Sequence, residues 1–81
     1  MHKLKLRSVD TGRILKEEEY ESLRLLDDIS DMYMDKKRSC YVYLGKDDKW
    51  RIEFVRMKVS VYGEGIVYDL YFNMREARVR V

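Results

Sequence analysis

The chain has 81 residues, which corresponds to one domain, and we expect a single domain over residues 1–81. Its 46% hydrophobic and 12% aromatic content excludes an intrinsically disordered chain, although 40% of the residues are charged. The net charge of +2 is too small by itself to indicate a nucleic-acid partner.

The composition also argues against a membrane span, a disulfide framework and a cofactor. The longest uncharged run covers residues 39–45, whereas a membrane helix needs roughly 18 to 20 apolar residues. Cys40 is the sole cysteine, so it has no partner for an internal disulfide, and no His/Cys cluster indicates a structural metal. The glycines all fall in expected turns, so no phosphate-binding loop is indicated. We expect a cytoplasmic protein without a membrane partner, a metal or a cofactor.

The first half of the chain predicts a hairpin and a helix. Residues 3–9 alternate apolar with polar side chains, which is the period of a half-buried strand. Residues 10–12 (Asp-Thr-Gly) predict a tight turn, after which residues 13–15 pair back. From Glu17 to about Met34 the spacing is helical, with Lys16 in the N-cap position. The segment 9–23 is similar to the hairpin-then-helix opening of many small bacterial and phage proteins.

The second half predicts strands. Residues 40–44 and 50–54 alternate apolar with polar or tyrosine side chains, and a turn at residues 45–48 separates them. The apolar set then changes parity, because Phe54 is followed by Val55, so we predict a bulge or a sharp bend there. Further strands are expected at residues 66–72 and 77–81.

These elements predict an α+β fold in the order ββαββββ. Tight turns connect most strands, so we expect a mainly antiparallel sheet of about five to six strands. The long bent strand favours a strongly bent, small barrel-like sheet with one amphipathic helix packed on it. The expected core consists of Trp50, Ile52, Phe54, Val59, Val61, Tyr68, Leu70 and Phe72 from the strands and Leu23, Leu26, Ile29 and Tyr33 from the helix.

Charge is segregated along the chain. Residues 10–35 hold nine acidic and three basic residues, whereas residues 36–81 hold eleven basic and six acidic residues. The helix is therefore expected to be acidic and the sheet basic. A basic protein partner would bind the acidic helix face, which is expected to consist of Glu17, Glu21, Asp28, Asp31 and Asp35.

The basic sheet supports an alternative interpretation. Lysines, arginines and tyrosines on the outward parity are typical of single-stranded nucleic-acid binders, where cations contact phosphates and rings stack on bases. The residues of this alternative are Lys3, Lys5, Arg7, Tyr41, Tyr43, Arg51, Arg78 and Arg80. The competing explanation is that charged side chains keep strand edges from aggregating. The same edges could pair two copies of the chain into a homo-oligomer.

Catalysis is the least supported class of function. Asp27, Asp28, Asp31 and Asp35 have helical spacing, but hard-metal sites usually combine carboxylates from different elements. Cys40 lies on the apolar parity, which indicates a buried thiol rather than an activated nucleophile. Small bacterial endoribonuclease toxins share the Arg, Lys and Tyr chemistry but usually have two helices. We therefore predict a non-enzymatic adaptor, inhibitor or regulator, of phage or mobile-element type, that binds a larger protein.

Overall fold

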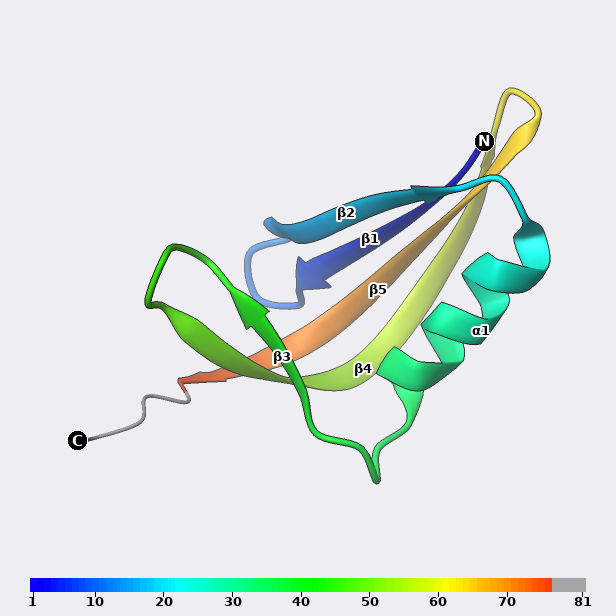
Figure 1. The fold of residues 1–81 in the computed structure, drawn as a ribbon. Coiled ribbons are helices and arrows are strands. Elements are labelled where there is room, and N and C mark those ends of the chain that lie inside the picture. The colour runs from blue at the N-terminus through cyan, green and yellow to red at the C-terminus, as the bar shows by residue number, and fades with distance from the viewer. Residues whose placement is uncertain (77–81) are drawn as a thin grey trace.

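The structure, a computed structural model, describes residues 1–76 as five strands and one helix. The elements are β1 (His2–Ser8), β2 (Ile14–Tyr20), α1 (Leu23–Met34), β3 (Cys40–Tyr43), β4 (Lys49–Tyr62) and β5 (Gly65–Glu76). The strands form one sheet in the order β2-β1-β5-β4-β3, and α1 lies along one face of it (Figure 1). The sheet curls until its edge strands, β2 and β3, approach each other.

This architecture confirms the coarse prediction and corrects its details. The fold is α+β, with a nearly closed, barrel-like sheet and one helix. Three of the neighbouring strand pairs are antiparallel, but β1 and β5 are parallel, so the sheet is mixed. The described order is ββαβββ, and the strand expected at residues 77–81 lies outside the described residues.

The helix begins at Leu23, so the prediction that it begins at Glu17 is wrong. Residues 17–20 belong to β2, where Glu17 lies opposite Lys5 and Glu19 lies opposite Lys3. Opposite charges across an antiparallel pair stabilise it, which overrides the helix propensity of three consecutive glutamates. The N-cap is Ser22, whose Oγ accepts a hydrogen bond from the Leu25 amide at 3.3 Å.

The predicted bulge in the long strand is confirmed. The register of β4 against β5 shifts between Phe54 and Arg56. Before the bulge, Phe54 lies opposite Phe72, and after it Met57 lies opposite Leu70, so both apolar sets face the same side of the sheet. One extra residue therefore lets β4 bend while its apolar side chains before and after the bulge stay on the same face of the sheet.

The core lies between the concave face of the sheet and α1. Its centre is Phe72, which is fully buried and makes edge-to-face contacts with Tyr33 and Phe54. Leu26 is the fully buried anchor of the helix. The buried apolar residues are Leu4, Leu6, Leu26, Val42, Ile52, Leu70 and Phe72. Of the other expected core residues, those that are half-buried and packed against this set are Trp50, Phe54, Tyr68, Ile29 and Tyr33.

Three expected core residues are exposed instead. Val59 is 52% exposed and Val61 is 74% exposed, because the β4–β5 hairpin extends beyond the body that α1 covers (Figure 1). Leu23, at the first turn of α1, is 38% exposed. We call residues 56–62 of β4 the β4 arm. The arm contributes to the elongated shape of the molecule, which measures 47 × 24 × 21 Å.

Candidate functional site

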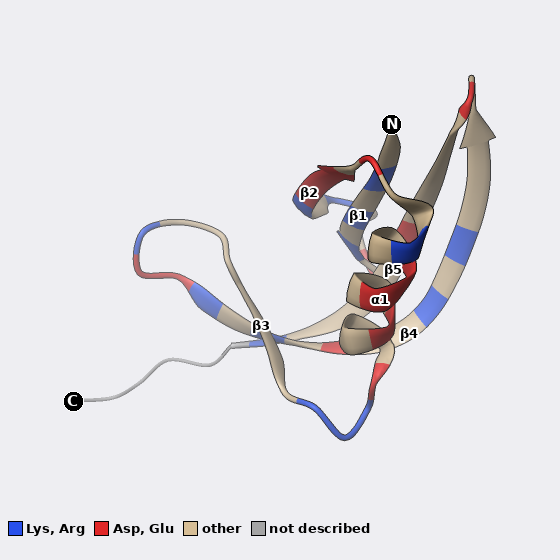
Figure 2. Cartoon of the chain, turned by 45° about the vertical axis from the view of Figure 1, so that its right-hand side comes forward, with Lys and Arg blue, Asp and Glu red and all other residues tan. Residues whose placement is uncertain are grey.

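The acidic face predicted for the helix is divided between elements. Asp28 and Asp31 are exposed on α1, and Asp35 is its C-cap. Glu17 lies on β2 and Glu21 lies in the connection before the helix, because the helix starts later than predicted. Most of the charged positions on α1 are acidic, whereas those on the β4 arm are basic (Figure 2).

A stripe of apolar side chains runs along the flank of α1. Leu25 is 47% exposed, Met32 is 46% exposed, and the half-buried Ile29 lies between them. The spacing i, i+4, i+7 places the three side chains on one side of the helix. Asp28 precedes Met32 by four residues and follows Leu25 by three, so its carboxylate borders the stripe. We call Leu25, Ile29 and Met32 the α1 stripe.

The α1 stripe borders a hollow where the sheet does not close. This hollow has a volume of about 360 Å³ and lies between α1, β2 and the start of β3. Its lining consists of Glu18, Tyr20, Ile29, Met32, Tyr33, Arg38, Ser39, Cys40 and Tyr41. Met32 and Ile29 therefore form a wall of the hollow as well as part of the exposed stripe. The arrangement combines an apolar ridge with an adjacent depression.

A group of polar side chains on β2 borders this hollow, which Glu18 and Tyr20 help to line. The Lys16 ammonium lies 3.0 Å from the Glu18 carboxylate, which also accepts a hydrogen bond from the Tyr20 hydroxyl. These contacts, the tyrosine hydrogen bond first, lower the pKa of Glu18 below its usual value, and the Glu18 carboxylate raises the pKa of Lys16. Burial is the first cause that raises the pKa of Tyr20, and its bond to Glu18 is the second. Lys16, Glu18 and Tyr20 are paired with one another, so the Glu18 carboxylate at the hollow already has two partners and is not placed to act as a free base.

Cys40 lines the same hollow and is not activated. Its Sγ lies 3.7 Å from the Met32 carbonyl oxygen, and burial raises the pKa of the thiol. A nucleophilic cysteine needs a lowered pKa, so the geometry favours an apolar contact at this position.

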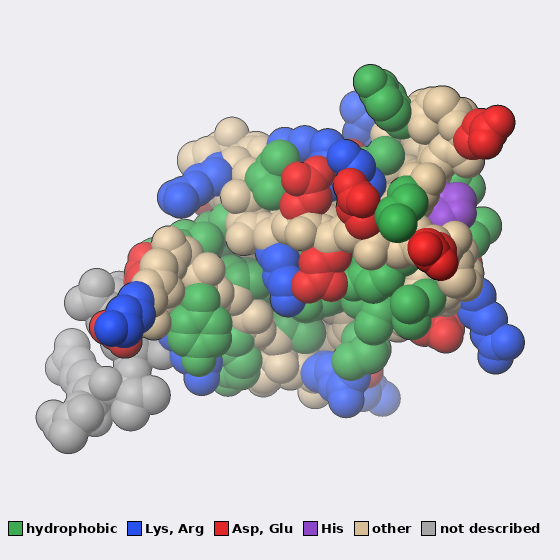
Figure 3. Space-filling view, turned by 45° about the horizontal axis from the view of Figure 1, so that its top comes forward, with side chains coloured by type: hydrophobic (Ala, Val, Ile, Leu, Met, Phe, Trp, Pro, Cys, Tyr) green, Lys and Arg blue, Asp and Glu red, His purple; other side chains and the backbone are tan. Residues whose placement is uncertain are grey.

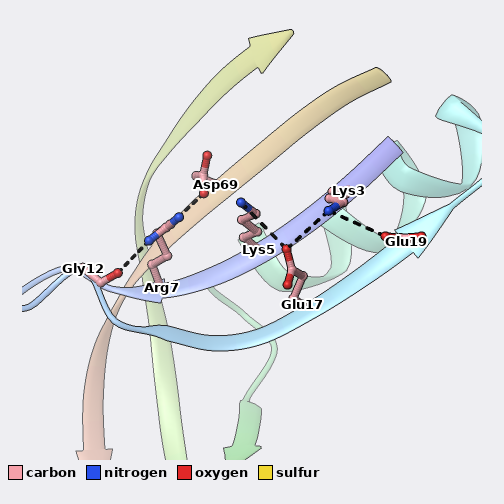
Figure 4. A network of polar contacts seen from close by, with 7 residues as sticks. All are labelled: Lys3, Lys5, Arg7, Gly12, Glu17, Glu19 and Asp69. Atoms are coloured by element: carbon pink, nitrogen blue, oxygen red, sulfur yellow. Dashed lines mark hydrogen bonds and ion pairs between the residues drawn. The ribbon is translucent and has the colours of Figure 1, made fainter. Parts of the chain in front are cut away.

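The predicted basic face is neutralised over β1 and β2. The Lys3 ammonium lies 3.6 Å from the Glu19 carboxylate, and the Lys5 ammonium lies 3.8 Å from that of Glu17 (Figure 4). Arg7 Nε donates to Asp69 at 2.7 Å, and Arg7 Nη1 donates to the Gly12 carbonyl at 2.8 Å. Acidic and basic side chains are likewise neighbours in the upper part of the space-filling view (Figure 3). These three cations therefore have carboxylate partners within the chain, which weakens their role as a phosphate-binding surface.

The outer face of β3 and β4 differs from that of β1 and β2. Tyr41 is 43% exposed and Tyr43 is 61% exposed, and they lie opposite Arg51 and Lys49, respectively. The Lys49 ammonium sits 4.3 Å from the centre of the Tyr41 ring. Within residues 1–76, neither Lys49 nor Arg51 forms an ion pair. The remaining members of the predicted set, Arg78 and Arg80, lie outside the described residues.

Other features of the described residues give less support for a binding site. A larger hollow of about 510 Å³ lies beside the β4 bulge, but its rim carries charges of both signs from Asp35, Lys36, Arg38, Arg51 and Glu53. Among residues 1–76, no three His, Cys, Asp or Glu side chains converge as a metal site, and the Asp27 carboxylate accepts a hydrogen bond from the Tyr68 hydroxyl at 2.5 Å. No helix in this part of the chain has the length and apolar character to cross a membrane.

The sequence patterns did not identify the α1 stripe. Ile29 was expected in the core, where it is half-buried, whereas Leu25 and Met32 were not expected to form a binding surface. The signal that was present is the i, i+4, i+7 spacing of Leu25, Ile29 and Met32 on the flank of the buried arc. No protein-family model, curated protein or solved structure matches the chain. The functional argument therefore rests on the surface itself.

Proposed function

We propose that this protein is a non-enzymatic interaction module that binds a larger protein through the α1 stripe and the adjoining hollow. The observation that supports it is the pairing of two half-exposed apolar side chains, Leu25 and Met32, with a depression of about 360 Å³ lined by Ile29, Tyr20 and Cys40. Side chains at i, i+4 and i+7 are the anchors with which amphipathic helices bind each other and bind grooves. In this proposal the protein is cytoplasmic and acts as an adaptor, inhibitor or regulator.

The chemistry of the surface indicates what the partner presents. The stripe and hollow suit an apolar side chain on the partner, since burying apolar area contributes about 25 cal/mol per Å² before the costs of association. Asp28 borders the stripe and Asp35 lies beyond its C-terminal end, both exposed. Carboxylates at a rim select basic neighbours and increase the rate of association. The partner segment is therefore an amphipathic one with basic residues beside its apolar anchor.

Capture from a lysate of cells that naturally contain the chain tests this proposal. The lysate is treated with nuclease and passed over the immobilised protein, over Met32→Asp and over the control Ile14→Asp. Ile14 is 42% exposed, close to the 46% of Met32, and it lies on β2 away from the stripe. Both variants add the same charge, so they differ only in position.

The expected result is a set of proteins held by the parent and by Ile14→Asp but lost with Met32→Asp. Thermal melts of both variants should match that of the parent, because both positions are exposed. Equal capture by Met32→Asp and the parent would exclude the α1 stripe as the binding surface. Capture that occurs from a parallel untreated lysate but not from the nuclease-treated one would favour the alternative described next.

The alternative proposal is that the outer face of β3 and β4 binds single-stranded nucleic acid. The observation in its favour is that Tyr41 and Tyr43 are exposed beside Lys49 and Arg51, whose charges have no carboxylate partner within residues 1–76. Stacking of a base on an exposed tyrosine is worth about 1 to 3 kcal/mol. Under this alternative, Tyr43→Ala weakens binding of single-stranded RNA or DNA, measured by fluorescence anisotropy, whereas Lys3→Ala does not.

A further inference from the structure

The β4 arm has an unpaired edge. In the described part of the chain, β3 pairs with Lys49–Ile52, so residues 56–62 have β5 as their one neighbouring strand. The apolar side chains of the arm share the concave face with Leu70 and Tyr68, yet they become more exposed toward the tip: Met57 39%, Val59 52% and Val61 74%. An edge with open backbone groups and one apolar face is suited to adding another strand.

The helix leaves this edge accessible. The bond from the Tyr68 hydroxyl to Asp27 places the adjacent flank of α1 over β5, one strand in from the edge. In the rotated view the outer half of β4 stands clear of the helix (Figure 2). A strand added beside the arm would therefore continue the concave apolar face without displacing α1.

The sequence of the arm is complementary to itself in the antiparallel direction. With Val59 opposite Val59 of a second copy, Met57 lies opposite Val61, and the concave face is apolar throughout. On the outer face, Lys58 lies opposite Ser60 and Arg56 lies opposite Tyr62, so no like charges oppose each other. Arg56 already lies 4.1 Å from the Tyr71 ring, and the Tyr62 of the second copy would offer it another aromatic neighbour.

Neighbouring registers are less favourable. Centring the pair on Lys58 would place two lysines opposite each other, which destabilises a strand pair. Centring it on Ser60 would place Met57 opposite the turn residue Gly63 and shorten the apolar run. The regular register of β4 begins at Arg56, directly after the bulge, so Arg56–Tyr62 is the longest run that pairs symmetrically.

We propose that the β4 arm binds a second copy of this chain as an antiparallel strand centred on Val59, giving a symmetric dimer with a continuous sheet. This interface lies on β4, whereas the α1 stripe faces β2 and β3, so the dimer does not depend on the proposed function. Dimerisation would cover Val59 and Val61 and would leave the hollow open.

Sedimentation velocity over a concentration series tests the dimer. The parent should change from a 9.9 kDa monomer toward twice that mass as concentration rises. Val59→Lys should weaken dimerisation by about tenfold or more, because it places two like charges opposite each other in an apolar row. The controls Ile14→Lys and Met32→Asp should dimerise like the parent. A parent that stays monomeric, or a dimer that Met32→Asp disrupts and Val59→Lys does not, would overturn the proposal.

Disulfide trapping tests the register in a Cys40→Ser background. Val59→Cys should oxidise to a covalent dimer. A mixture of Met57→Cys and Val61→Cys should form the mixed disulfide in preference to either self-linked product, because these positions face each other across the two-fold axis. Tyr43→Cys is an exposed control that should remain reduced. Equal yields from all variants would contradict an ordered strand pair.

Discussion

Strand β1 and the β4 arm have similar alternating sequences, but within residues 1–76 neighbouring strands cover β1 on both sides and cover the arm on one side only. Both alternate apolar with charged residues, HKLKLRS in β1 and RMKVSVY in the arm. On β1, the apolar side chains Leu4 and Leu6 are buried and the cations have carboxylate neighbours on β2 and β5. On the arm, the apolar side chains are exposed and the strand has one edge without a partner in the described chain.

The difference shows that an alternating pattern does not by itself decide which surface is available to a partner. Strand β1 is hydrogen-bonded to β2 on one side and to β5 on the other, and its lysines and arginine form ion pairs with carboxylates of these two strands. The arm lies beyond the helix and beyond β3, so its residues remain available. Candidate binding surfaces in a chain this short are the places where intramolecular packing ends.

The largest difference in the free energy of unfolding should be between a substitution in the core and one in the β4 arm. Phe72→Ala removes a fully buried ring that contacts Tyr33 and Phe54, and should reduce the free energy of unfolding by about 3 to 5 kcal/mol. Val61→Ala, at 74% exposure, should change it by less than about 0.5 kcal/mol. Denaturant unfolding at a concentration where the protein is monomeric measures both. Comparable losses would mean that the arm is part of the core.

A smaller effect should distinguish two kinds of ion pair on the outer face. Asp69 is 8% exposed and accepts from Arg7 at 2.7 Å, so Asp69→Ala should cost about 1 to 3 kcal/mol by leaving the guanidinium without its partner. Glu19→Ala, which breaks an exposed pair with Lys3, should cost about 1 kcal/mol or less. The loss from Glu19→Ala should also shrink in high salt. Equal and equally salt-dependent losses would show that Arg7 and Asp69 are not shielded.

Ser30 offers a test with the opposite sign. Its Oγ is buried and lacks a hydrogen-bond partner in the described residues, within a helix whose neighbours are apolar. Ser30→Ala should therefore raise the free energy of unfolding by about 0.5 to 1 kcal/mol, from removal of an unpaired hydroxyl and better helix propensity. The readout is the midpoint of urea unfolding at constant slope. A destabilised variant would contradict the view that the Ser30 hydroxyl is an unpaired buried group.

The smallest effect concerns pH. The pKa of Glu18 is lowered from 4.5 by Tyr20 and Lys16, so the ionised carboxylate stabilises the fold above about pH 4.5 and loses that contribution as pH falls through its folded pKa. Melting temperatures of the parent and Glu18→Gln should therefore differ near pH 7 and converge as the pH falls below the folded pKa of Glu18. A difference that persists in acid would assign the effect to packing instead of charge.

The sequence was most informative where a feature depends on adjacent residues. The bulge followed from Phe54 and Val55 standing next to each other, and the turn at Gly12, with its φ of 75°, followed from Asp-Thr-Gly. The start of the helix did not follow, because three glutamates favour a helix locally while Lys3 and Lys5 hold them in a strand.

The candidate surfaces depended on contacts between distant segments. The parallel pairing of β1 with β5 joins residues more than sixty positions apart and has no local signature. The exposure of Val59 and Val61 depends on how far the hairpin extends beyond α1, and the exposure of Leu25 and Met32 depends on which other elements pack against the flank of the helix. The acidic residues Asp28 and Asp31 were placed correctly on the helix, but Glu17 and Glu21 were not.

Photo-crosslinking from four surfaces in native lysate tests the account most directly. A photoreactive phenylalanine is placed in turn at four exposed positions. These are Met32 on the α1 stripe, Val61 on the β4 arm, Tyr43 on β3 and Glu19 on β2. The account predicts a nuclease-resistant adduct with a larger protein from Met32, an adduct with a second copy from Val61, and none from Glu19. A dominant adduct from Tyr43 that nuclease removes, with none from Met32, would contradict it.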